Sequence, residues 1–218
     1  MTMDEPILSR VEASLLDSAL SLSEARRRLE AWHELGVQRV VAYPGLLEAL
    51  GSSAFVGFDV AGAISFPNGG DTLANKRMGL LECVRLGAKA ASVVLSPHLL
   101  AQGDAVLLER EMRALVETAP EIEVRFVVEF GRLPDEAALV LIRVLRDCRP
   151  AFLVPSSGSF PPALGPAGVD SVRRRLSRKI GLLVGEDVQD PGLAERYFAG
   201  GADRITSSAP EELREVAS

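Results

Sequence analysis

The sequence predicts a closed barrel of eight parallel strands and surrounding helices, the (β/α)8 TIM-barrel fold, as one domain over residues 1–218. Short apolar runs alternate with longer segments of helical period throughout the chain. The later runs are almost continuously apolar, as expected for strands buried on both faces. Gly36, Gly87 and Gly200 each close a helical segment shortly before the next run. The alternative, an open doubly wound sheet, usually carries a glycine fingerprint after its first strand, and none is present.

Eight short runs are the predicted strands. In chain order they are Val11–Leu15, Val40–Tyr43, Ala61–Phe66, Ser92–Leu95, Val124–Val128, Phe152–Val154, Gly181–Val184 and Arg204–Thr206. Ser21 and Glu24 form a capping box that begins the first helix. Pro134, Pro191 and Pro210 are expected in the first turns of later helices. The loop at 156–168 is rich in Pro, Gly and Ser and is a candidate lid.

Charge and composition exclude several classes of partner. The net charge is −6 and no long basic run is present, which argues against nucleic acid and against a membrane surface. No signal peptide is recognised, and no apolar run approaches the roughly 20 residues needed to span a bilayer. The two cysteines, Cys83 and Cys148, show no pairing signature and are expected as free thiols. These features predict a cytoplasmic protein.

Functional groups of such barrels lie at the carboxyl ends of the strands. Glu129 follows the fifth strand and is a candidate general acid or base, or else a structural carboxylate paired with Arg125 or Arg132. His98 follows the fourth strand and is a second catalytic candidate. A lone histidine is a weak metal signal, so neither a metal nor a cofactor is predicted.

Several small polar residues are candidates for ligand binding. They are Asn68 after the third strand, Ser92 on the fourth, Ser156, Ser157 and Gly158 after the sixth, Glu186 and Asp187 after the seventh, and Ser207 and Ser208 at the eighth. The hydroxyls of Ser207 and Ser208 are able to hold an anion; alternatively, Ser208 only caps the helix opened by Pro210.

The chain resembles the deoxyribose-phosphate aldolases from about Val11 to Ser208. The resemblance rests on short motifs in the same order and spacing: Val40–Pro44, Ser65–Gly70, Gln102–Asp104, Val127–Glu129, Phe152–Gly158 and Ala202–Ser208. It implies a small TIM barrel, a dimer and a class I aldolase that works through a Schiff base. It also matches Glu12 to a strand-one aspartate and Glu129 to a strand-five glutamate, which makes Glu12 a third catalytic candidate.

The chemical positions of the resemblance are changed. The family's reactive lysine is matched by Val154, its second lysine by Leu183, and its strand-four aspartate by Ser92. A phosphate-binding Ser-Gly-Gly loop is matched by Gly185, Glu186 and Asp187, whose carboxylates repel a dianion.

Two functional interpretations remain open. One is a non-catalytic homologue that binds a small-molecule ligand or a partner protein. The other is a lyase or isomerase with changed acid/base chemistry on a small, non-phosphorylated carbonyl or polyol.

Overall fold

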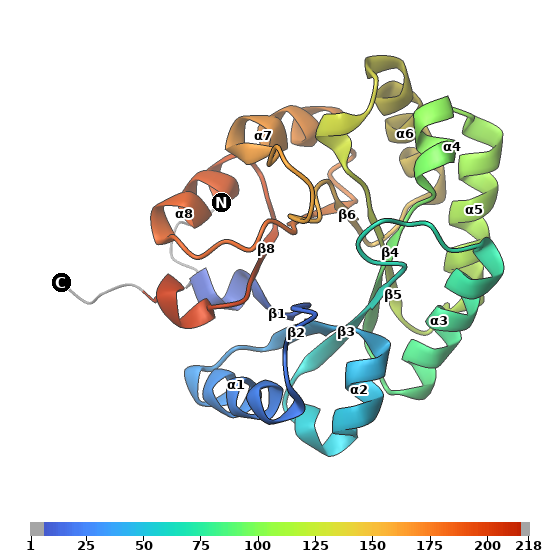
Figure 1. Cartoon of the computed structure of the whole chain (residues 1–218). Coiled ribbons are helices and arrows are strands. Elements are labelled where there is room, and N and C mark those ends of the chain that lie inside the picture. The colour runs from blue at the N-terminus through green and yellow to red at the C-terminus, as the bar shows by residue number, and fades with distance from the viewer. Residues whose placement is uncertain (1–6, 215–218) are drawn as a thin grey trace.

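Eight parallel strands close into a barrel in a computed structural model that describes residues 7–214. Figure 1 shows the strands at the centre and the helices around them. The strands are β1 (Val11–Leu15), β2 (Arg39–Ala42), β3 (Asp59–Ile64), β4 (Ala90–Val94), β5 (Glu123–Val127), β6 (Phe152–Val154), β7 (Gly181–Val184) and β8 (Arg204–Ser207). Pairing of Val11 with Ile205 joins β1 to β8 and completes the circle. The predicted TIM barrel is therefore confirmed.

Eight α-helices are present among the described residues. They are α1 (Leu22–Leu35), α2 (Pro44–Leu50), α3 (Leu73–Arg85), α4 (Pro97–Gln102), α5 (Ala105–Thr118), α6 (Asp135–Cys148), α7 (Gly165–Arg175) and α8 (Pro191–Ala199). The predicted cap of α1 is formed, since the Glu24 amide donates to Ser21 Oγ over 3.2 Å. Gly36 ends α1 in the left-handed region, with φ of 84°. None of these helices is long and apolar enough to cross a membrane.

The strands separate two interiors. Val93, Phe126 and Leu153 are fully buried and belong to the large apolar cluster between the strands and the helices. Their neighbours Ser92 and Arg125 take the alternate positions of the same strands, which point into the barrel. On these strands, polar side chains point into the barrel and apolar side chains point toward the helices.

Some element boundaries differ from the prediction. Strand β3 ends at Ile64 rather than residue 66, because Ser65 adopts a positive φ of 58° that breaks the strand. Helix α7 begins at Gly165, inside the segment expected to be loop. Two helices, α4 and α5, follow β4.

The prediction that Ser208 caps a final helix is wrong. The chain after β8 forms a short 3-10 turn, Pro210–Leu213, whose cap residue is Ala209 and which has no side-chain cap. Ser208 is instead bonded to Asp187, both through its amide and through its hydroxyl. The 3-10 turn lies against α1 and α8, and the residues after 214 lie outside the described range.

Candidate functional site

A cavity of about 340 Å³ opens where the barrel strands end. Part of its wall is an apolar cluster of Val127, Val154, Leu183 and Phe66. The remaining lining is mostly small or hydroxylated. It comprises Glu12, Ser14, Leu16, Asp17, Arg28, Val41, Ala63, Ser92, Ser157, Gly158, Ser159, Gly185, Asp187, Thr206 and Ser208. No lysine is among these described residues, and the volume suits a small organic molecule.

The deepest charged group of the cavity is Glu12, which is only 1% exposed. Arg125 on β5 donates from Nη1 to Glu12 Oε2 over 2.5 Å, although β5 and β1 lie on opposite sides of the barrel. Burial opposes the charge of Arg125, but the attraction and hydrogen bond of Glu12 raise its pKa overall. Both groups are therefore held as a buried ion pair at the floor.

The three predicted catalytic residues are not brought together. Glu12 lines the cavity, whereas Glu129 lies outside its lining and accepts a hydrogen bond from the Ser157 amide over 3.0 Å. The alternative pairing of Glu129 with Arg125 is not formed, because Arg125 bonds Glu12 and Glu123. His98 is exposed and lines a separate groove with Ser96 and Glu111.

Five of the predicted ligand-binding residues line the cavity: Ser92, Ser157, Gly158, Asp187 and Ser208. The other four, Asn68, Ser156, Glu186 and Ser207, do not. Ser156 and Ser207 are buried beside the cavity and accept bonds from the Gly158 and Ala209 amides. Position at a strand end thus brings a residue near the cavity without fixing where its side chain points.

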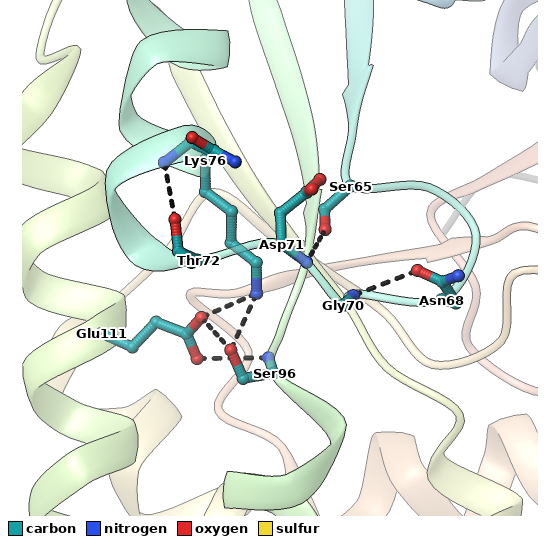
Figure 2. Close-up of polar contacts among 9 residues, drawn as sticks. Ser65, Asn68, Gly70, Asp71, Thr72, Lys76, Ser96 and Glu111 are labelled. Carbon is teal, nitrogen blue, oxygen red and sulfur yellow. Dashed lines mark hydrogen bonds and ion pairs between the residues drawn. The ribbon is translucent and has the colours of Figure 1, made fainter.

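Asn68 illustrates a side chain used by its own loop. It is exposed, and its Oδ1 accepts a hydrogen bond from the Gly70 amide over 3.0 Å, as Figure 2 shows. In the same loop the Asp71 amide donates to Ser65 Oγ over 3.2 Å. These bonds shape the connection between β3 and α3.

The Glu186 side chain forms hydrogen bonds in the wall of the cavity mouth and does not line the cavity. Its Oε1 accepts from the Leu164 amide over 2.6 Å, and its Oε2 accepts from the Tyr197 hydroxyl. Burial and this hydrogen bond raise the pKa of the Tyr197 phenol above its ordinary value. Glu186 thereby ties the loop before α7 to α8.

Asp187 and Ser208 form a closed pair at the rim. The Ser208 amide donates to Asp187 Oδ1 over 2.6 Å, and the Ser208 hydroxyl donates to Oδ2 over 3.0 Å. Asp187 has a positive φ of 48°, which aspartate tolerates better than most residues. The donors that an incoming anion needs at Ser208 are therefore occupied by a carboxylate of the chain itself.

None of the chain's three lysines reaches the cavity. Lys76 on α3 is fully buried and donates to Ser96 Oγ over 2.9 Å and to Glu111 Oε1 over 2.8 Å (Figure 2). The Ser96 hydroxyl and amide also donate to Glu111, so all three groups are engaged. Lys89 and Lys179 are exposed and lie one and two residues before the first residues of β4 and β7, at the opposite end of the barrel.

Two charged lining residues were not predicted. Asp17 follows β1, and its Oδ1 accepts from the Ala19 amide over 2.8 Å. Arg28 reaches the rim from α1 and bonds Glu24 over 3.2 Å. An arginine within an amphipathic helix carries no sequence signal that separates it from a solvent-facing one. Among residues 7–214, no group of three or more His, Cys, Asp or Glu is arranged to hold a metal.

Comparison with known proteins finds deoxyribose-phosphate aldolases among the relatives of this chain. A deoxyribose-phosphate aldolase of Corynebacterium glutamicum is 27% identical over 213 residues, covering 95% of each chain. One of Thermoanaerobacter pseudethanolicus is 24% identical over 214 residues, covering 96% of each. No protein-family profile matches the chain.

Solved structures agree on the fold. A deoxyribose phosphate aldolase of Aeropyrum pernix, described as a tetramer, superposes with a TM-score of 0.87 at 19% identity, covering 95% of this chain and 88% of that one. An aldolase named QR15 superposes with a TM-score of 0.86 at 21% identity, covering 95% and 93%.

Proposed function

The chain is a homologue of the deoxyribose-phosphate aldolases, and we propose that it binds a small molecule without their Schiff-base chemistry. The observation that carries this proposal is the lining of the cavity, which contains no lysine in the part of the chain that the structure describes. The side chains at the family's chemical positions, Val154, Leu183 and Ser92, all line it and are uncharged. An iminium needs a neutral amine within reach of the substrate carbonyl, and these side chains offer none.

The rim supports a change of ligand. Asp17 and Asp187 line the mouth, while Arg28, the one cation that lines it among residues 7–214, bonds Glu24. Asp187 also occupies the amide and hydroxyl of Ser208. A phosphate dianion would meet two carboxylates and lose a pair of donors, so the proposed ligand is non-phosphorylated.

The chemistry of Glu12 favours a second candidate, a lyase or isomerase acting by acid/base catalysis on a small carbonyl compound or polyol. Glu12 is the deepest carboxylate of the cavity lining. Turnover of such a compound that falls at least tenfold in Glu12→Asp, with folding unchanged, would favour this candidate over a pure binding protein. A dimer, a protein partner and a cytoplasmic location stay predictions, and analytical ultracentrifugation measures the first.

Disappearance of 2-deoxyribose 5-phosphate tests the main proposal. The chain is expected to leave the compound unchanged under conditions in which the Corynebacterium glutamicum enzyme consumes it. Consumption at a rate within about a hundredfold of that control would overturn the proposed loss of activity.

A further inference from the structure

We propose that the cavity takes a neutral, hydroxylated molecule, with a hydroxyl head at Ser92 and Glu12 and an apolar body against Val154 and Leu183. This inference rests on the proposed non-covalent function and adds the ligand's charge and orientation. It is carried by one buried side chain that lacks a partner, and by the distribution of charge above and below it.

Ser92 is the side chain without a partner. It lines the cavity, is only 7% exposed, and its hydroxyl makes no hydrogen bond to any other described residue. Its oxygen is not among the fully enclosed side-chain atoms that lack a partner, so it opens to the cavity and can bond whatever fills it. Ser92 is therefore poised to exchange a hydrogen bond with a ligand. Thr206, 8% exposed, and Glu12 line the cavity with it.

The floor disfavours a cationic head. Glu12 is already paired with Arg125, and Arg39 and Arg204 begin the neighbouring strands β2 and β8. Burial together with the positive charges of Arg125 and Arg39 lowers the pKa of Arg204. The Glu123 carboxylate lies 3.4 Å from Arg125 and 3.9 Å from Arg204. Because the Glu12 charge is already balanced by Arg125, an ammonium placed beside it would lose its hydration without gaining an unpaired counter-charge.

An anionic head is disfavoured for a different reason. Arg125 is not among the lining residues, so the charged group that a ligand meets at the floor is the Glu12 carboxylate. A carboxylate or phosphate would also pass Asp17 and Asp187 at the rim. A hydroxyl avoids both penalties, because it donates to Glu12 and accepts from or donates to Ser92.

The walls define the rest of the ligand. Val127, Val154 and Leu183 are at most 4% exposed and form one apolar cluster that lines the cavity. Hydrocarbon placed there is removed from water, which provides the non-directional part of the affinity. The site therefore suits a short aliphatic alcohol or diol rather than a fully hydroxylated sugar chain.

Three five-carbon compounds that differ in their head group test this inference: a vicinal pentanediol, pentylammonium and pentanoate. Each is titrated into methyl-labelled protein, and binding is read from the methyl resonances of Val154 and Leu183. We expect the diol to bind at least about fivefold more tightly than either ion. Ser92→Ala should weaken diol binding about three- to tenfold, the range for one net hydrogen bond. Ser171→Ala, the same change on α7, is the control and should leave it unaltered.

The outcomes separate this inference from the proposed function. Tighter binding of either ion, equal diol affinity in Ser92→Ala, or no methyl shift with any head overturns the inference. None of these results creates a reactive amine, so the proposed loss of Schiff-base chemistry is decided separately, by turnover of 2-deoxyribose 5-phosphate and by covalent trapping.

Discussion

Arg125 and Glu12 join opposite walls of the barrel, with Nη1 of the arginine 2.5 Å from Oε2 of the glutamate. Both side chains are at least nine-tenths buried. The Nε of Arg125 has no hydrogen-bond partner among the described residues, so Glu12 is the main compensation for its charge. This pair sets the floor of the cavity and fixes the most deeply placed carboxylate of the site.

Breaking this pair from one side should be costly. Arg125→Met leaves the Glu12 carboxylate buried without its partner, and we expect the free energy of unfolding to fall by about 3–5 kcal/mol. The double variant Glu12→Leu with Arg125→Met should lose less than the single variant, since neither charge remains. Urea denaturation measures both. Arg113→Met, at the exposed pair with Glu109, is the control and should cost at most about 1 kcal/mol. A double variant less stable than the single one would contradict the account.

The buried lysine predicts a similar asymmetry. In Lys76→Met, the Glu111 carboxylate keeps only its bonds from Ser96, and we expect a loss of about 3–5 kcal/mol in unfolding free energy. Lys89→Met removes an exposed lysine and should change stability by less than about 0.5 kcal/mol. Equal effects of the two substitutions would show that the network of Figure 2 contributes little.

Alkaline pH should destabilise the chain through Tyr197. Burial and the Glu186 carboxylate raise the folded pKa of this phenol above the ordinary value of about 10. The folded state therefore keeps a proton that the unfolded state releases, so this contribution to stability is complete below pH about 10 and is lost as pH rises further. Unfolding free energy measured between pH about 8 and 11 should fall less steeply in Tyr197→Phe. An identical slope in both proteins would contradict the assignment.

Removing the rim carboxylate should admit anions. Asp187→Ala frees the Ser208 amide and hydroxyl and deletes one negative charge at the mouth. We expect inorganic phosphate to bind this variant at least several-fold more tightly than the parent, by isothermal titration. Gln189→Ala removes a donor to Asp187 Oδ2 and to Ser208 Oγ but keeps the carboxylate in place, so it is the matched control. If phosphate binds the parent and Asp187→Ala with equal affinity, Asp187 does not keep anions from the rim.

The barrel was predictable from the sequence because its signals are local. Apolar runs such as Phe152–Val154 and helix ends such as Gly36 each reveal their own element, and their alternation gives the topology. The predicted end of an element was wrong where the backbone conformation of one residue sets that end. Ser65 is the example, because its positive φ ends β3 two residues early.

The site was less predictable because it depends on contacts between distant segments. Glu12 and Arg125 are 113 residues apart. Arg125 bonds Glu12 rather than Glu129 because closure of the barrel places β5 opposite β1. Arg28 reaches the rim from α1, so its position in the site does not follow from the strand ends. His98 follows β4 as predicted, but it lies on α4 and lines a different groove from the cavity at the strand ends.

Covalent trapping tests the central claim most directly. The chain is incubated with 2-deoxyribose 5-phosphate and borohydride, and its intact mass is then measured. The variant Val154→Lys is the positive control, because it places an amine in the apolar wall, where burial lowers a lysine pKa and favours the nucleophilic form. We predict no added mass on the parent chain. In the Val154→Lys variant we predict the mass of a reduced Schiff-base adduct. A stable lysine adduct on the parent chain would contradict the account.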